Sequence, residues 1–267
     1  MAISGKVGNV YSSALLIENC EDVWTTGGAG RAVDTTTGKV GTYAARVTTT
    51  TIGATTLLQY KVISSANLTT YDGVYFWARS NLAAGVGSGA LQLQLDDTNT
   101  CLSPLENLEL PALTVNTWRQ CFNKFTNPAD LTAILAVGLY QVTDLDDGTF
   151  DVDDVQALKE IDGIKSWSLD YSSDTLDATD FDDAGIRAHI IGQSGWSGSF
   201  EGYKDTTPLG IGAEVYLVLS ESSAISSFRD WIGKAIITAC HPSATHEGIV
   251  SYSYDFQGTG SLESPSA

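Results

Sequence analysis

The sequence is short of positive charge. Its 267 residues include 14 lysines and arginines against 32 aspartates and glutamates, which gives a net charge of −18. A protein that binds nucleic acid tightly needs basic side chains to neutralise the phosphates. This composition therefore argues against tight nucleic-acid binding. DNA remains compatible as a passing neighbour, because an acidic surface repels the phosphate backbone. The alternative is that the acidity serves solubility alone.

Long apolar runs are also missing. No stretch approaches the roughly 18 apolar residues that a membrane span needs. The N-terminal segment MAISGKVGNVYSS has neither the basic region nor the apolar core of a signal peptide. We therefore expect no membrane insertion, and synthesis in a cytoplasm without a cleaved leader.

The sequence contains four cysteines, Cys20, Cys101, Cys121 and Cys240, without a CxxC pair or a Cys/His cluster. This spacing favours reduced, buried thiols over metal ligands, with a Cys101–Cys121 bridge left open if the two lie on neighbouring strands. Catalytic signatures such as GxSxG, HExxH and the P-loop do not occur, and the three histidines have no obvious partners. The sequence therefore predicts a protein that is not an enzyme.

Helical spacing of apolar residues is nearly absent, and period-two alternation takes its place. Strand candidates such as GVYFWARS, LQLQLDD and EVYLVLSES are separated by turns rich in Gly, Asn, Asp and Ser. Short strands with regular turns predict an all-β chain of sandwiches or barrels. A boundary is expected near residues 155–161.

The first portion, residues 16–157, carries the motifs LLIENCEDVW, GTYAARVTTTT, LTTYDGVYFWARS, LQLQLDD, VNTWRQC, ILAVGLYQV and GTFDVDDVQA, in that order. In this order they resemble the carbohydrate-binding jelly rolls of the galactose-binding-like class. In that family an early acidic residue and an aspartate of the closing strand hold a structural calcium ion. The resemblance implies Glu21 and Asp154 as its ligands, and calcium requires such hard oxygen ligands. Solvated carboxylates or strand-end caps are the alternative.

The same resemblance implies that the first portion binds a glycan of a host surface. Sugar binding requires exposed aromatic rings that stack on a pyranose face, joined by polar side chains. The candidate stacking residues are Trp24, Tyr71 and Trp118. Jelly rolls host many unrelated functions, so the fold by itself does not establish this one.

The second portion carries SWSL at residues 166–169, DAT at 177–179, GWSGSFEGY at 195–203 and SYSYDFQGTG at 251–260. These motifs and their order are similar to the major tail tube proteins of long-tailed, siphovirus-type bacteriophages. In that family an opening strand of the form GKxGxV runs almost directly into the equivalent of IKSWSLD. Here GKVGNV at residues 5–10 is separated from it by the first portion. We therefore expect a discontinuous tail tube domain at residues 1–15 and 158–263, an inserted jelly roll at 16–157, and a short tail at 264–267.

The resemblance implies a β-sandwich that forms hexameric rings, which stack into a tube around the path of genomic DNA. It further implies other tail proteins as partners and a place in the phage tail, assembled in the bacterial cytoplasm. An acidic run would then line the bore, take part in ring stacking, or form a solvated face. Its members are Asp170, Asp174, Asp177, Asp180, Asp182 and Asp183.

The sequence thus predicts a structural tail tube subunit with an outward jelly roll. A stand-alone two-domain lectin or virion adhesin, in which sugar recognition is the main task, is the alternative. A glycoside-active enzyme is the third reading, and no nucleophile or acid–base motif supports it.

Overall fold

The computed structural model describes residues 9–179, 186–203, 208–220, 230–244 and 249–265. These residues form antiparallel strands and one short 3₁₀ helix, η1 (Pro128–Asp130), and the described part contains no α-helix. The prediction of an all-β chain is confirmed. No helix in these ranges has the length and apolar character needed to cross a membrane.

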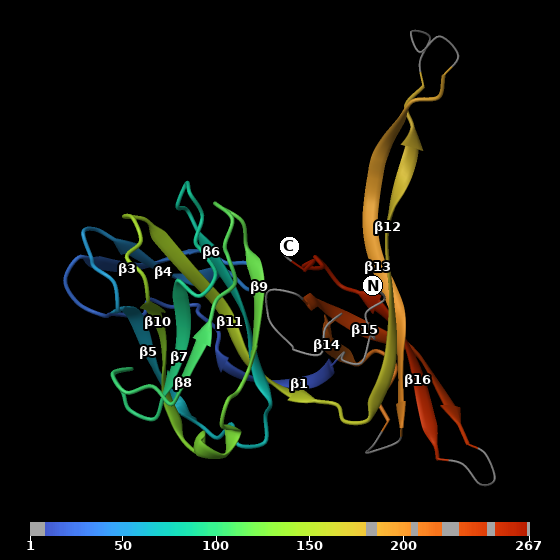
Figure 1. Ribbon diagram of the computed structural model, residues 1–267, viewed down its shortest axis with the longest axis horizontal. Helices are drawn as coiled ribbons and strands as arrows, with labels where there is room; N and C mark the ends of the chain where they lie inside the picture. The colour runs from blue at the N-terminus through green and yellow to red at the C-terminus, as the bar shows by residue number, and fades with distance from the viewer. Residues whose placement is uncertain (1–8, 180–185, 204–207, 221–229, 245–248, 266–267) are drawn as a thin grey trace, which may run out of the picture.

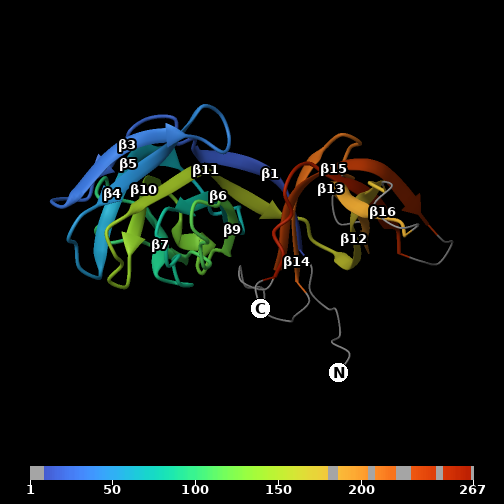
Figure 2. The same ribbon diagram turned by 90° about the horizontal axis from the view of Figure 1, so that it is seen from above.

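The strands lie in two sheets (Figures 1 and 2). The larger sheet has 11 strands in the order β12-β13-β16-β15-β14-β1-β11-β4-β3, and β6 joins it by pairing with β11 and β9. Its bounds are β1 (Asn9–Glu18), β3 (Arg31–Thr37), β4 (Tyr43–Thr49), β6 (Gly73–Ser80), β9 (Arg119–Lys124), β11 (Thr149–Glu160), β12 (Ile164–Asp177), β13 (His189–Tyr203), β14 (Glu214–Ser220), β15 (Asp230–Ser243) and β16 (Ser251–Gly258). The second sheet has 5 strands in the order β2-β5-β10-β7-β8. They are β2 (Thr25–Thr26), β5 (Thr56–Ala66), β10 (Ile134–Gln141), β7 (Leu91–Asp96) and β8 (Glu106–Glu109).

The first core lies between the five-stranded sheet and the strands β4, β6, β9 and β11 of the larger sheet. Alternate residues of β7, Leu91, Leu93 and Leu95, point into it and are almost fully buried. Phe76 of β6 and Val152 of β11 meet them from the other sheet. Apolar side chains at every second position therefore form a two-layer sandwich from residues 17–157.

A second, separate core is built by the strands β12 to β16. Its centre contains Trp196 and Phe200 of β13, Leu217 of β14, Ile237 of β15 and Phe256 of β16. Residues 16–157 contribute no side chain to this cluster as it is described. The molecule therefore has two bodies side by side, which Figures 1 and 2 show joined through β1 and β11.

Strand β1 belongs to both bodies. Residues 9–12 pair with β14 on one side, and residues 11–18 pair with β11 on the other, from Tyr11↔Glu160 to Glu18↔Val155. The expected boundaries at residues 15/16 and 157/158 therefore fall inside two antiparallel strands that lie next to each other. The chain enters and leaves the first body through one pair of neighbouring strands.

A third apolar cluster forms the joint between the bodies. Tyr75, Trp77 and Phe122 of β6 and β9 pack with Tyr216 of β14 and Ile232 of β15. The Tyr75 and Tyr216 rings have centroids 4.9 Å apart. The chain after β16 adds hydrogen bonds, because Gln120 Nε2 donates to the Ser261 carbonyl at 2.8 Å. The two bodies are thus held together by aromatic packing and by the C-terminal segment.

The four cysteines are free thiols, and Cys20, Cys101 and Cys121 are buried. The Cys101–Cys121 bridge that the spacing left open is not formed. Cys101 packs with Leu57 and Ala136 beside the five-stranded sheet, whereas Cys121 lies in the first core. Burial raises the pKa of the Cys101 thiol to about 12, so it is a small apolar side chain.

Candidate functional site

The most prominent surface feature is a two-stranded ribbon formed by the outer halves of β12 and β13. The strand β13 pairs with β16 only from Ser197 to Tyr203, while its pairing with β12 continues outward to Asp177↔His189. Figure 1 shows this ribbon extending far from both bodies. An isolated hairpin is only marginally stable in water, so the ribbon is a candidate for contact with another molecule.

Large apolar side chains are exposed along this ribbon. Ile191 is 80% exposed, and its neighbours Ile190 and Leu176 are 56% and 53% exposed. Tyr171, nearer the body, is 55% exposed. Leu176 and Ile190 are also directly opposite each other in the strand pair. Apolar residues gathered on a protruding element mark an interaction surface more than isolated exposed residues do.

The acidic run lies on the same element where it is described. Asp170, Asp174 and Asp177 are exposed residues of β12. Asp177 Oδ1 accepts hydrogen bonds from the Thr179 hydroxyl and backbone N–H, which lower the pKa of this carboxyl. Asp180, Asp182 and Asp183 lie outside the described residues. By strand alternation, Asp170 and Asp174 lie on the same face of β12 as Leu176, and Asp177 lies on the opposite face.

The predicted calcium ligands have separate partners. Glu21 accepts hydrogen bonds from the backbone N–H groups of Thr42 and Tyr43, at 2.7 and 3.1 Å. The adjacent N–H groups of Lys39 and Val40 donate to Asp153 Oδ2, at 2.7 and 2.9 Å. Glu21 and Asp153 thus both accept hydrogen bonds from the turn between β3 and β4.

Asp154 takes a different direction because β11 has an irregularity between residues 153 and 156. Its φ is 49°, and its Oδ1 accepts a hydrogen bond from Gln156 Nε2. Burial raises the pKa of the Asp153 carboxyl to about 6, and Asp153 Oδ1 is buried without a hydrogen-bond partner in the described structure. In the described ranges no three His, Cys, Asp or Glu side chains form a metal-holding group. Calcium bound by Glu21 and Asp154 stays a prediction, and the function proposed below does not use it.

The outer face of the five-stranded sheet carries a cavity of about 610 Å³. Gln92 and Gln94 of β7 line it together with Asn107 of β8 and Tyr140 of β10. Gln94 Nε2 donates to Asn107 Oδ1 at 2.8 Å, but Gln94 Oε1 is buried and has no partner in the described structure. An unpartnered buried amide oxygen beside an aromatic ring is suited to accept a hydrogen bond from a ligand hydroxyl.

The three predicted stacking residues do not line this cavity as described. Trp24 is 2% exposed and belongs to the first core, so it offers no ring face to a sugar. Tyr71 is partly buried against the same core. Trp118 packs at the joint, and the Arg79 guanidinium lies over its ring, 4.4 Å from the centroid.

The sequence predicted aromatic stacking residues and did not indicate Gln92 and Gln94. The stretch LQLQLD alternates leucine with glutamine, and this alternation sends both amides to the face opposite the core. The alternation thus places both glutamines on the outer face, but it does not distinguish them from ordinary solvent-facing residues.

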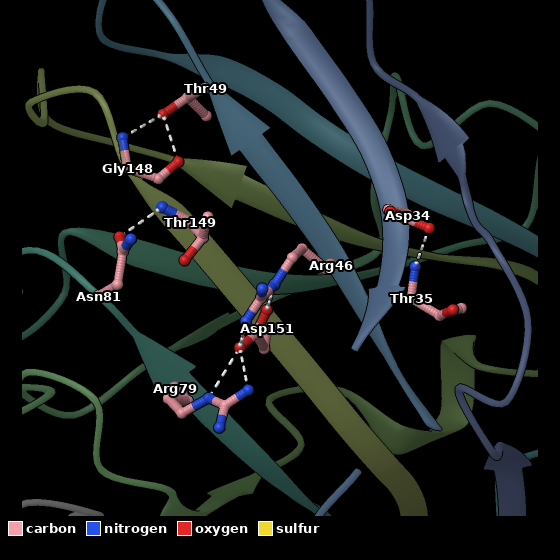
Figure 3. Close-up of polar contacts among 9 residues, drawn as sticks. All are labelled: Asp34, Thr35, Arg46, Thr49, Arg79, Asn81, Gly148, Thr149 and Asp151. Carbon is pink, nitrogen blue, oxygen red and sulfur yellow. Dashed lines mark hydrogen bonds and ion pairs between the residues drawn. The ribbon is translucent and has the colours of Figure 1, made fainter. Parts of the chain in front are cut away.

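A charged cluster joins strands β4, β11 and β6 of the larger sheet in the first body (Figure 3). Asp151 of β11 is directly opposite Arg46 of β4 and Arg79 of β6. Arg46 donates to both oxygens of Asp151, at 2.7 and 2.9 Å, and Arg79 Nε donates to Oδ2 at 2.8 Å. The Asp151 side chain is 1% exposed. One buried carboxylate thus ties three neighbouring strands together.

The fold and these features define an all-β protein with two antiparallel sheets and a protruding ribbon. No family model matches the chain, and no curated protein matches it. A solved tail of an empty GTA particle with C6 symmetry is similar over 41% of this chain and 87% of that chain, with 20% identity and a TM-score of 0.31. An exo-beta-agarase is similar over 56% of this chain, with 15% identity and a TM-score of 0.38.

The chain spans 25% of the length of that agarase. At these identities and TM-scores, neither similarity carries an argument about what this chain does.

Proposed function

We propose that this chain is a structural subunit that assembles with copies of itself through the β12–β13 ribbon. The main support is that, in the described structure, the outer halves of β12 and β13 pair only with each other. They also expose Leu176, Ile190 and Ile191. Covering these side chains with a neighbouring subunit would remove their apolar surface from water. Assembly would also stabilise a hairpin that is marginal by itself.

The open edge of β12 supports the same proposal. This strand is the last in the order of the larger sheet, so along its length one row of backbone N–H and C=O groups has no neighbouring strand in the described structure. Such an edge is a template for pairing with another chain. Identical subunits that pair through two different surfaces form closed rings or open stacks.

In its finer form, the proposal is a tail tube subunit of a phage-type particle, with hexameric rings stacked around the path of DNA. The order of motifs in residues 161–260 supports it, as does the net charge of −18, which suits a channel that DNA traverses without binding. Other tail proteins would be its partners at the ends of the tube. Asp170, Asp174 and Asp177 would face the bore or the next ring.

A second function is proposed for residues 16–157, as an inserted domain that binds glycans on a host surface. The observation in its favour is the cavity with the unpartnered Gln94 amide oxygen on the five-stranded sheet. Entry and exit through the paired strands β1 and β11 suit an insertion, because the ends of the inserted segment are adjacent. Many copies on one particle would multiply a weak affinity.

Replacing Ile191 by aspartate tests the assembly proposal. Ile191 is 80% exposed, so this change leaves the fold of the subunit intact but places a charge in the proposed contact. We expect the unmodified protein to form rings or tubes in electron micrographs at high protein concentration. The variant is expected to raise the concentration needed for assembly by about tenfold or more, since a buried unpaired charge costs more than about 1.4 kcal/mol.

The matched control is Leu102→Asp, because Leu102 is 75% exposed but lies in the first body. It should assemble like the unmodified protein. Persistent monomers of the unmodified chain that bind a glycan array would instead support the stand-alone lectin.

A further inference from the structure

A cavity of about 360 Å³ lies at the joint between the two bodies, on the face of the larger sheet opposite the first core. Residues of both bodies line it. Tyr75, Trp77 and Asp154 come from the first body, and Tyr216 and Lys234 come from the second. Its volume is at the lower end of the range of roughly 300–1,000 Å³ found for ligand pockets. The cavity therefore suits a small ligand.

The walls of the cavity are rigid because their polar groups bond to one another. The Tyr75 hydroxyl donates to Gln120 Oε1 at 2.9 Å. The Tyr216 hydroxyl donates to Gln156 Oε1 at 2.7 Å, and Gln156 Nε2 in turn donates to Asp154 Oδ1. Both phenols are thus fixed in place, and the aromatic rings form an apolar wall.

Charged groups with unused bonding capacity line the same cavity. The ammonium of Lys39 lies over the Trp77 ring, 4.8 Å from its centroid, and has no ion pair in the described structure. Lys234 lies over the Tyr216 ring at 5.6 Å and pairs with Glu214 at 2.8 Å. Asp154 Oδ2 has no hydrogen-bond partner in the described structure.

These groups differ in kind from those of the sheet cavity described above. Two ammonium groups can hold an anion, the Asp154 carboxylate can accept hydrogen bonds from hydroxyls, and the aromatic wall suits the C–H face of a ring. A ligand that satisfies all three carries a carboxylate and several hydroxyls on a small saturated ring.

We propose that the joint cavity binds an acidic monosaccharide unit, of the uronic acid class. Its carboxylate would pair with Lys39 and Lys234, and its hydroxyls would donate to Asp154. Because lining residues come from both bodies, binding would also strengthen the joint. The site is independent of assembly through the ribbon, so either proposal stands if the other fails.

Calorimetric titration of the full chain with sodium glucuronate tests this proposal, with glucose as the neutral comparison. We expect saturable binding of glucuronate in the millimolar range and weaker binding of glucose. Lys39→Gln removes one cation, and Asp154→Asn removes the carboxylate while tolerating the φ of 49°. Each should weaken glucuronate binding by about ten- to a hundredfold, as expected for hydrogen bonds to charged groups.

The matched control is Lys159→Gln, since Lys159 is an exposed lysine of β11 that does not line the cavity as described. It should bind glucuronate like the unmodified protein. Thermal melts of all variants establish that each is folded. No saturation by glucuronate, or equal binding by the Lys39→Gln and Asp154→Asn variants, would overturn the proposal. Binding abolished by Gln94→Ala instead would place the sugar on the five-stranded sheet and overturn it as well.

Discussion

Asp151 stabilises the larger sheet by pairing with arginines of two neighbouring strands. It is buried and satisfies two arginines at once, so replacing it with asparagine leaves both guanidinium groups without their anion. The arginines keep 30% and 21% of their side chains exposed, which lets water offset part of the loss. We expect Asp151→Asn to lower the free energy of unfolding by about 2–3 kcal/mol.

Denaturant unfolding followed by tryptophan fluorescence measures this change. The matched control is Asp22→Asn, because Asp22 pairs with Lys61 through a side chain that is 67% exposed. That pair is worth less than about 1 kcal/mol. Equal losses in the two variants would contradict the view that burial makes the Asp151 cluster strong.

The contacts of individual side chains were the hardest feature to predict from the sequence. Asp151 stands in the motif FDVDD, where the alternation shows only that it faces away from Phe150 and Val152. Its two arginines are more than 70 positions away, and only the strand order β4-β11-β6 brings them together. Likewise, the local irregularity in β11 decides that Asp153, and not Asp154, meets the turn that binds Glu21.

The strand β13 explains the composition of the stretch GWSGSFEGY. Trp196 and Phe200 point into the second core, while small residues between them let β12 and β16 approach on both sides. A Cβ atom at Gly198 would lie 2.1 Å from the Ser168 carbonyl oxygen and 2.8 Å from the Phe256 ring. At Gly195, three residues earlier, it would meet nothing within 4 Å.

These two glycines provide a matched pair of substitutions. Gly198→Ala forces β12 or Phe256 to move, so we expect it to lower the free energy of unfolding by about 1–3 kcal/mol. Gly195→Ala should leave it unchanged or raise it by up to about 1 kcal/mol, because alanine restricts the unfolded chain. Thermal and denaturant unfolding of both variants checks this. A larger loss of stability for Gly195→Ala than for Gly198→Ala would contradict the open space that surrounds Gly195.

Alternation predicted most strands, because each body needs an apolar face and period two reveals it. It did not reveal how far β12 and β13 continue beyond their neighbour β16. Exposed strands lack a buried face, so the outer ribbon has no apolar alternation to read: residues 170–177 are exposed throughout. The Gln94 cavity was missed for a related reason, since polar residues on an outer face look like ordinary solvent-facing positions.

The arrangement of two bodies has a direct consequence for deletion of the first. Ala14 and Leu158 are opposite each other in the β1–β11 pair, so replacing residues 15–157 by Asn-Gly would close the two strand ends with a hairpin turn. The second core would keep all its described members. Tyr216, Val218 and Ile232 would lose their packing against the first body. Each newly exposed large side chain costs about 1.5–3 kcal/mol, so the shortened chain should be folded but less stable.

Electron microscopy and glycan-array binding of this shortened chain separate the two proposed functions. Because the ribbon is untouched, we expect rings or tubes to form, with a narrower outline where the first body is missing. Binding to glycans and to glucuronate should be lost, because the Gln94 cavity and half of the joint cavity are removed. A folded shortened chain that no longer assembles would place the assembly surface in residues 15–157, and glycan binding that survives the deletion would remove that function from the first body.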